Sequence, residues 1–455
     1  MKQVAILGAG LVSKPLADYL MDRAGYRVLM ATRTVAKAEA IIAGRSNGRA
    51  LAWTTDDLEA LEGIVREADL VVSMIPPSLH IPVAEACLRN GKPLVTTSYV
   101  SPEMQALDEQ AKQNGVLLLN EIGEDPGIDH MGAKRMIDEV ASKGGRVRSL
   151  TSYGAGLPSF ESNRNPMGYK FSWSPRGVLL AAQTAAAYLK NGEVVEVPAA
   201  ELFDHHWLVD IEGLGSFETY PNRSSLRYLP HFGLDEKASL FRGLLRFVGW
   251  CSTMKSLIAL KLLDTREERD FAGLSYREFT ASSIGKPGGG REEVAAFLGL
   301  SIKSDTMERL GWLGLFDERP LPMAKGTNVD VIVDLMVKKM SYLPGEIDMI
   351  IVHDEIEVEF PDRRERHLST MRVEGVPQGD SAMSRAVSLP AAIASRLILE
   401  GSIDLSGVHM PMLSEIYEPV LTELEEYAFA FQHRLGGVCE EVGPVGSEAR
   451  ISGPR

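Results

Sequence analysis

Two glycines close to the N-terminus have the spacing of a phosphate-binding turn. The sequence reads Gly8-Ala9-Gly10-Leu11-Val12-Ser13 directly after the apolar run Val4–Leu7. The glycines permit a tight turn and let the backbone approach a pyrophosphate, whose charge then meets the N-terminus of the next helix. Ser13 is small enough at the third position for that helix to pack closely on the strand. Such a turn alone is weak evidence, but between a buried strand and a helix it predicts a dinucleotide site.

The residues after the second predicted strand indicate which dinucleotide is bound. An NAD enzyme usually has Asp or Glu here, which holds the ribose hydroxyls. This chain instead has Ala31-Thr32-Arg33-Thr34, without an acid. Arg33 can pair with a 2′-phosphate, and the two threonines can donate hydrogen bonds to it. The sequence therefore favours NADP, and the alternative is an Arg33 that only faces solvent.

Polar side chains also follow three later strands. They lie in Ser73-Met74-Ile75-Pro76, in Thr96-Thr97-Ser98-Tyr99 and in the segment Asn120–His130, which is dense in carboxylates and glycines. In an open parallel sheet, the carboxyl ends of the strands border the ligand crevice. We therefore expect these three segments to face the cofactor and the substrate.

Short apolar runs alternate with helical patterns over roughly the first 120 residues, as in parallel α/β folds. The predicted strands are Val4–Leu7, Arg27–Ala31, Ala50–Trp53, Leu70–Met74, Leu94–Thr97 and Val116–Leu119. The predicted helices between them include Asp57–Ala68, His80–Leu88 and Pro102–Asn114. Six strands with such crossovers predict a doubly wound Rossmann sheet.

The pattern changes after Asn120. We expect a helix over Asp129–Ser142, a strand over Arg146–Tyr153 and a loop rich in Gly, Pro, Ser and Asn over Gly154–Gly168. Helical patterns around Leu240–Leu263 and Glu292–Leu315 indicate an all-α insertion. Two strands, Asp348–Phe360 and His367–Val373, predict an antiparallel hairpin with one solvent-facing side, and Ala386–Leu399 predicts a helix.

These patterns give an α/β protein with a second, α+β domain. The expected parts are a Rossmann NADP-binding domain over 1–125, an α+β domain over 126–235 and 325–380, a helical insertion over 236–324, and a flexible tail over 436–455. The helix at 386–400 is expected to pack back on the Rossmann domain.

Composition narrows the classes of function. The 455 residues include 48 basic and 62 acidic ones, for a formal charge of -14, and such a surface disfavours nucleic-acid binding through bulk electrostatics. Three widely spaced cysteines form neither a disulfide framework nor a zinc pattern, and we expect no metal. No run of about 18 apolar residues indicates a membrane span. We expect a cytoplasmic protein with a small-molecule substrate.

Several longer motifs resemble one family closely. They are Thr97-Ser98-Tyr99-Val100-Ser101-Pro102, the segment Asn120–His130, the block Gly168–Leu180, Tyr220-Pro221-Asn222-Arg223 and Trp312-Leu313-Gly314-Leu315-Phe316. The chain is similar in these motifs to saccharopine reductase, the glutamate-forming saccharopine dehydrogenase of lysine metabolism. The resemblance runs from Val4 to about Tyr427, and the block Gly168–Leu180 is its most specific part.

The resemblance implies hydride transfer between NADP and the carbon–nitrogen bond of saccharopine. Saccharopine would be interconverted with L-glutamate and 2-aminoadipate 6-semialdehyde through an imine. Saccharopine carries three carboxylates, and Arg223 and Arg246 match substrate-binding arginines of the family. Bidentate guanidinium–carboxylate pairs would hold the substrate in a fixed position. The resemblance also implies a homodimer, with the α+β domain serving for substrate binding and dimerisation.

Position-by-position matching assigns the remaining site residues. Substrate contacts fall on Ser98, Tyr99, Asp125, Arg223, Leu244, Leu245 and Arg246. Cofactor contacts fall on Gly8, Ala9, Gly10, Leu11, Thr32, Arg33, Thr34, Met74, Ile75, Thr97, Ser98, Tyr99, Asp125, Pro126, Gly127, Ile128, Asp129, His130, Met131 and Ser174. Asp125 and Tyr99 are the first candidates for proton transfer, followed by Lys170 and His130.

The chain departs from the family at some positions, and two other functions stay open. Gly154 stands where the family has a cysteine, and Leu244 replaces a small polar residue. One alternative is a carboxy(nor)spermidine-type dehydrogenase, although its polyamine substrate would favour an acidic site over Arg223 and Arg246. The other is a non-catalytic dinucleotide sensor, which would need no amino-acid site.

Overall fold

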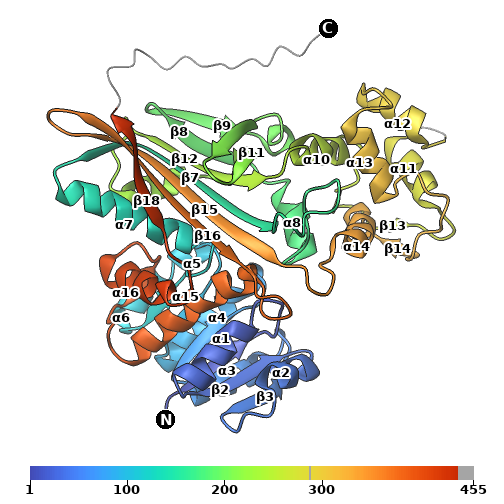
Figure 1. The fold of residues 1–455 in the computed structure, drawn as a ribbon. Coiled ribbons are helices and arrows are strands. Elements are labelled where there is room, and N and C mark those ends of the chain that lie inside the picture. Colours follow the sequence, from blue (N-terminus) through green and yellow to red (C-terminus); the bar gives the residue numbers. More distant parts are fainter. Residues whose placement is uncertain (286–287, 439–455) are drawn as a thin grey trace.

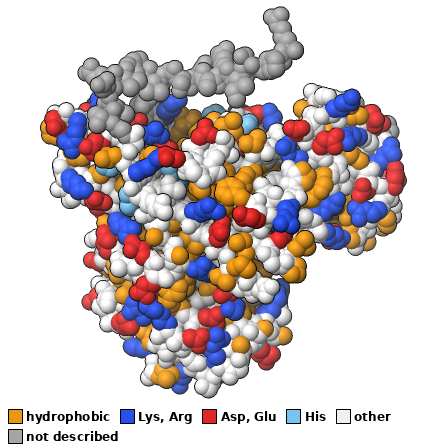
Figure 2. Space-filling view, in the orientation of Figure 1, with side chains coloured by type: hydrophobic (Ala, Val, Ile, Leu, Met, Phe, Trp, Pro, Cys, Tyr) orange, Lys and Arg blue, Asp and Glu red, His pale blue; other side chains and the backbone are white. Residues whose placement is uncertain are grey.

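The chain folds around two sheets, which lie at the bottom and the top of the view in Figure 1. The long helix α7 (Ile128–Ser142) lies between them. The structure is a computed structural model that describes residues 1–285 and 288–438. The first sheet belongs to the N-terminal part of the chain, and the second is built from segments between residues 146 and 438. Figure 2 shows acidic and basic side chains interspersed over one face of the molecule.

The first sheet is fully parallel and has seven strands in the order β17-β6-β5-β4-β1-β2-β3. Its strands are β1 (Gln3–Leu7), β2 (Arg27–Thr32), β3 (Gly48–Ala52), β4 (Leu70–Ser73), β5 (Leu94–Thr96), β6 (Leu117–Leu119) and β17 (Gly407–His409). The central strands are apolar and buried because helices cover both faces. The predicted Rossmann sheet is confirmed, and the C-terminal region returns to add a seventh strand.

Helices from both ends of the chain cover this sheet. They are α1 (Lys14–Asp18), which continues as a π-helix (Tyr19–Arg23), α2 (Val35–Ile42), α3 (Leu58–Glu67), α4 (His80–Asn90), α5 (Pro102–Gln105), α6 (Asp108–Gln113), α15 (Ala382–Leu399) and α16 (Ser414–Glu425). The Ser388 hydroxyl of α15 donates a hydrogen bond to the backbone oxygen of Val12, beside α1. By length and composition α15 could span a membrane, but 72% of it is buried inside the protein, as in a core helix.

The second sheet is mixed and has nine strands. Its main path is β10-β11-β12-β7-β15-β16-β18, and β8 joins it beside β12 with β9 outside β8. The strands are β7 (Arg146–Pro158), β8 (Ala186–Lys190), β9 (Glu193–Val197), β10 (Trp207–Ile211), β11 (Gly215–Pro221), β12 (Ser239–Arg246), β15 (Asp348–Glu359), β16 (Arg364–Glu374) and β18 (Gln432–Val438). Helix α7 (Ile128–Ser142) packs across β7 and β15, and so links the two sheets.

A helical layer extends from the second sheet at the right of Figure 1. It comprises α10 (Trp250–Ala259), α11 (Tyr276–Ile284), α12 (Arg291–Leu298), α13 (Asp305–Leu313) and α14 (Asn328–Met340), with a small sheet of β13 (Arg269–Asp270) and β14 (Lys325–Gly326). The shorter helices α8 (Pro175–Ala181) and α9 (Leu229–Phe232) precede it in the chain. Large apolar side chains such as Phe271, Phe279 and Leu310 form the core of this layer.

The expected start of the helical insertion is wrong. The segment at 236–249 is not helical, because Ser239–Arg246 forms β12, which pairs with β7 on one side and β11 on the other. Both faces of β12 are covered, so its apolar residues do not alternate with polar ones and can be mistaken for a helix. The helices run instead from Trp250 to Met340.

Three smaller expectations also need correction. The predicted loop Gly154–Gly168 begins late, because β7 continues to Pro158. The hairpin β15–β16 is confirmed, but β15 is buried on both faces over most of its length, and helices α7 and α15 pack against it. Residues 436–438 of the predicted tail belong to β18, and 439–455 lie outside the described residues.

Candidate functional site

The turn after β1 has the geometry that a dinucleotide requires. Gly8 has φ +107°, and a Cβ there would lie 3.0 Å from the backbone oxygen of Met74. Gly10 is different, because a Cβ there would meet only the Ser13 hydroxyl at 4.0 Å. That hydroxyl is buried and accepts a hydrogen bond from the Gly10 backbone N–H, 3.0 Å away. The buried Ser13 side chain thus stabilises the turn, while Gly10 itself remains exposed to solvent.

The end of β2 fits a 2′-phosphate. Arg33 and Thr34 are exposed, and Thr32 is half-buried beside them. Within residues 1–285 and 288–438, no carboxylate lies within ion-pair distance of Arg33. A guanidinium without a protein partner at this place can hold a phosphate in bidentate fashion. The turn and the acid-free end of β2 together fit NADP.

Tyr99 and Asp125 meet at the edge of the first sheet that faces the second. The Tyr99 hydroxyl donates to Asp125 Oδ1 at 2.6 Å, and Asn222 Nδ2 donates to Oδ2 at 2.8 Å. Arg242 Nη2 donates to Asp125 Oδ1 at 2.6 Å as well. Burial, and then the charge of Asp125, hold the pKa of Tyr99 well above its usual range, so Tyr99 is the neutral donor of this pair.

Arg242 ties this group to the start of α7. Its Nη2 also donates to Asp129 Oδ2 at 2.7 Å, and its side chain is almost fully buried. His130 is buried next to it, between the carboxylates of Asp129 and Glu121 and against the ring of Tyr228. Burial alone would lower the pKa of His130, but the Asp129 carboxylate raises it. His130 therefore stabilises the buried part of the site through these contacts, and its side chain is not exposed.

Two arginines beside this network have no carboxylate partner among the described residues. Arg223 is exposed, has φ +57° and stacks over the Tyr99 ring with its Cζ 4.9 Å from the ring centroid. Arg246 is only 6% exposed, and its Nη1 donates to the backbone oxygen of Leu245. Both guanidinium groups therefore remain available to bind carboxylates of a ligand.

Ser98 is positioned by a buried histidine. His80 Nε2 lies 2.8 Å from the Ser98 hydroxyl and 3.1 Å from that of Thr96, while its Nδ1 lies 2.9 Å from the Ser73 hydroxyl. Burial lowers the pKa of His80 to about 4, so the ring is neutral at physiological pH. Three hydroxyls at the ends of β4 and β5 thus share one ring, which fixes the direction of Ser98.

The other predicted residues divide into open and buried positions. Leu11 and Ser174 are exposed, and the Ser174 hydroxyl accepts a hydrogen bond from the Gly177 backbone N–H as the N-cap of α8. Half-buried positions are Met74, Ile75, Thr97 and Leu244. Buried positions are Ala9, Pro126, Gly127, Ile128, Met131 and Leu245. Lys170 is buried and forms an ion pair with Glu346, so its ammonium group is not among the hydrogen-bond partners of Tyr99 and Asp125.

Sequence reasoning missed Asn222, Arg242 and Glu124. Asn222 lies inside the motif that contains Arg223, but an asparagine by itself does not indicate a catalytic or binding role. Arg242 and Arg246 are four residues apart, so on a strand they share one face with Leu244. The helical interpretation of this segment concealed that spacing. Glu124 stood in a segment singled out only for its many carboxylates.

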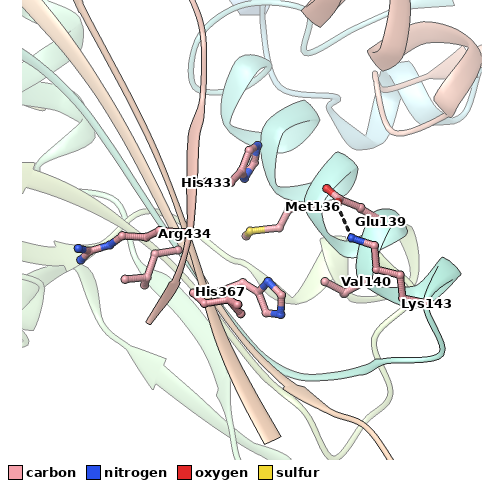
Figure 3. A pocket seen from close by; sticks show the side chains of 9 residues that line it. Met136, Glu139, Val140, Lys143, His367, His433 and Arg434 are labelled. Atoms are coloured by element: carbon pink, nitrogen blue, oxygen red, sulfur yellow. Dashed lines mark hydrogen bonds and ion pairs between the residues drawn. The ribbon is translucent and has the colours of Figure 1, made fainter. Parts of the chain in front are cut away.

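A separate cavity of about 340 Å³ lies between the later turns of α7 and the strands β16 and β18 (Figure 3). The residues that line it include His367, His433 and Lys143, which are labelled in Figure 3. The Lys143 ammonium group donates a hydrogen bond to the Glu139 carboxylate at 2.6 Å. None of the predicted site residues lines this cavity. In the part of the chain that the structure describes, no cluster of His, Cys, Asp and Glu has the composition of a metal site.

Comparison with known proteins places the chain among enzymes with these two domains. The saccharopine dehydrogenase NADP binding domain model matches residues 4–119, and the saccharopine dehydrogenase C-terminal domain model matches residues 123–429. The chain is 34% identical to the NADP(+), L-glutamate-forming saccharopine dehydrogenase of Schizosaccharomyces pombe, over 96% of this chain and 99% of that one. The Saccharomyces cerevisiae protein of the same name is 33% identical, over 93% and 97%.

Solved structures agree with this match. The apo saccharopine dehydrogenase (L-Glu forming) from Saccharomyces cerevisiae superposes with a TM-score of 0.87 at 31% identity, over 96% of this chain and 100% of that one. A homospermidine synthase from Legionella pneumophila, in complex with NAD, shares the fold alone, with a TM-score of 0.59 at 11% identity over 95% and 91% of the two chains. Matched over both domains and at nearly full length, the chain belongs to the saccharopine dehydrogenase family.

Proposed function

We propose that this chain is an NADP-dependent, L-glutamate-forming saccharopine dehydrogenase. The observation that supports it most strongly is a pair of arginines, Arg223 and Arg246, that have no carboxylate partner among the described residues and lie beside the hydrogen-bonded pair of Tyr99 and Asp125. A site that binds a substrate with three carboxylates needs such fixed cations. A site for a polyamine does not need them, and neither does a sensor that binds only the dinucleotide. The family match over both domains supports the same substrate.

The chain's own residues would bind the substrate and move protons. Bound NADP supplies the hydride acceptor for the carbon attached to the secondary amine. The amine must lose a proton before hydride leaves, and water must be activated to open the resulting imine. Asp125 is the acceptor for these protons, because Asn222 and Arg242 hold its carboxylate in place. Arg223 and Arg246 fix the substrate carboxylates, which places the reacting carbon.

Steady-state formation of reduced cofactor tests this proposal. Purified protein is mixed with saccharopine at alkaline pH, where the substrate amine loses its proton more readily, and NADP and NAD are compared. Turnover that prefers NADP is expected. No turnover with either cofactor, in protein that binds NADP, would exclude saccharopine as the substrate.

We further propose that the chain acts as a homodimer in the cytoplasm. The family resemblance supports the dimer. Composition and the two buried free cysteines, Cys87 and Cys251, support a reducing compartment. Light scattering on the purified protein and fractionation of the source cells test the two statements separately.

A further inference from the structure

Buried polar atoms without a close hydrogen-bond partner gather beside the network of Tyr99 and Asp125. Among the described residues they include Glu124 Oε1, Arg242 Nη1 and Arg246 Nε, together with the Tyr169 hydroxyl and Trp250 Nε1, which lie near the side chains of Trp173 and Tyr220. The Arg246 Cζ lies 5.2 Å from the Tyr169 ring centroid and 5.6 Å from that of Trp250. Because native proteins rarely leave buried polar groups unpaired, so many at one place indicate a ligand.

Glu124 and Arg246 are an acid and a base that lie near each other but do not form an ion pair. Their side chains belong to residues that are 7% and 6% exposed, and each influences the pKa of the other. Their nitrogen and oxygen atoms are nevertheless more than 4.0 Å apart, since no ion pair links them. Buried ionisable groups are almost always paired, so a buried acid and a buried base that do not contact each other are unusual.

The other charged groups near Glu124 are already paired. These groups are Asp125, Asp129 and Arg242, and one guanidinium nitrogen of Arg242 joins both aspartates. Arg223 lies on the other side of this group, over the Tyr99 ring. Glu124 and Arg246 are therefore the acid and the base here that have no ion-pair partner among the described residues and that a ligand with both charges can pair with.

We propose, on the basis of the function proposed above, that Glu124 and Arg246 together bind the zwitterionic α-amino-acid head of the substrate. Glu124 accepts hydrogen bonds from its primary ammonium group, and Arg246 pairs with its α-carboxylate. Saccharopine has only one such head, at its lysine-derived end. Arg223, next to Tyr99, is then left for the carboxylates of the glutamate-derived end, which keeps the nitrogen when the bond to the lysine-derived carbon is oxidised and hydrolysed.

A proton is released when this head binds. Burial, reinforced by the charges of Asp125 and Asp129, holds the pKa of Glu124 well above its usual range, so the free enzyme carries a neutral carboxyl there. A bound ammonium favours the ionised carboxylate, and the proton leaves to the buffer. Calorimetric titration of the enzyme with L-2-aminoadipate, in two buffers of different ionisation enthalpy, should show proton release that E124Q lacks.

A pair of substrates isolates the ammonium contact. The second substrate is N-(5-carboxypentyl)-L-glutamate, which is saccharopine without its primary amino group. Loss of one charge-assisted contact should lower the wild-type kcat/KM by roughly 10- to 100-fold. In E124Q the two substrates should differ by less than about threefold, because the partner of the ammonium is gone. E109Q, which alters an exposed glutamate on α6, should discriminate as the wild type does.

Each other outcome overturns the proposal. If E124Q discriminates as strongly as the wild type, Glu124 does not bind the ammonium. If E124Q lowers kcat equally for both substrates, Glu124 transfers a proton instead. E124D serves if E124Q does not fold, and should retain part of the discrimination. If the wild type oxidises neither substrate, the proposed function fails, and the calorimetric comparison with L-2-aminoadipate still decides whether Glu124 and Arg246 form an amino-acid site.

Discussion

Asp125 receives hydrogen bonds from Tyr99, Asn222 and Arg242, which come from three distant parts of the chain. Of these donors, Arg242 also holds Asp129, so one buried cation compensates two buried carboxylates. The same guanidinium lies over the ring of Tyr228, 4.9 Å from its centroid. The conformation of the Asp125 carboxylate, the proposed proton acceptor, therefore depends on a residue that need not touch the substrate.

Replacing Arg242 by methionine should destabilise the protein strongly. The change leaves the Asp125 carboxylate without its cation and Asp129 with His130 alone, and breaking a buried pair costs about 3–5 kcal/mol. The measurement is the free energy of unfolding in urea. R33A, at an exposed arginine, should change it by less than about 0.5 kcal/mol. An R242M protein as stable as R33A would show that Arg242 does not compensate these aspartates.

Arg33 should set the choice of cofactor. R33A removes the only predicted cation for the 2′-phosphate, so the KM for NADP should rise by roughly 10- to 100-fold, as expected for one lost charge-assisted contact. The KM for NAD should change little, since NAD lacks that phosphate. Steady-state kinetics with both cofactors measures this, and an unchanged ratio of the two KM values would rule out the assigned role.

Asp354 should make stability depend on pH. It is fully buried in β15, between Ser152 and Ser369 of the adjoining strands, and burial raises its pKa to about 8. Between about pH 4, the ordinary value in an unfolded chain, and pH 8, the folded state binds a proton that the unfolded state does not. Stability from this group is therefore complete below pH 4 and is lost as the pH rises to 8.

The D354N variant tests this dependence, because asparagine has a similar size and cannot ionise. Unfolding free energies measured from pH 5 to 8 should fall with pH more steeply in the wild type than in D354N. Parallel curves would mean that Asp354 is ionised throughout. D362N, at an exposed aspartate in the β15–β16 turn, should behave as the wild type does.

At the scale of elements, the turn between β1 and α1 has two glycines with different tasks. A side chain at Gly8 would press on the Met74 backbone in a left-handed conformation, whereas one at Gly10 would meet no protein atom closer than 4.0 Å. G8A should therefore lower the Tm of the protein without cofactor, and G10A should not. G10A should instead weaken NADP binding, because its methyl group occupies the approach of the pyrophosphate.

Thermal unfolding and cofactor titration of the two variants separate these effects. The interpretation fails if G10A loses as much Tm as G8A, or if G10A binds NADP as tightly as the wild type.

The Rossmann strands could be predicted almost to the residue because each is a short apolar run that ends in a turn signal. The segment Ser239–Arg246 could not, since an apolar strand covered on both faces lacks the alternation that distinguishes a strand from a helix. This error concealed Arg242, whose place on the same face as Arg246 follows directly once the segment is a strand. Tyr99, Asp125 and Arg223 were found through family motifs, which do not depend on secondary structure.

At the scale of the whole molecule, the site lies where two sheets meet. The first sheet contributes Tyr99 and Asp125 from its strand ends, and the second contributes Asn222, Arg242 and Arg246. Strand β17 and helices α15 and α16 return from the C-terminal part to complete the first sheet. The return of the helix at 386–400 to the Rossmann domain was predicted, and α15 confirms it. Strand β17 and helix α16 were not predicted, because such long-range pairing leaves no local signal.

Identification of the products of saccharopine oxidation tests the central claim most directly. Enzyme, saccharopine and NADP are incubated at alkaline pH, and amino acids and reduced cofactor are quantified together. The account predicts one L-glutamate and one 2-aminoadipate 6-semialdehyde for each NADPH formed. Release of lysine and 2-oxoglutarate would contradict it, because hydride would then have left the carbon on the other side of the nitrogen.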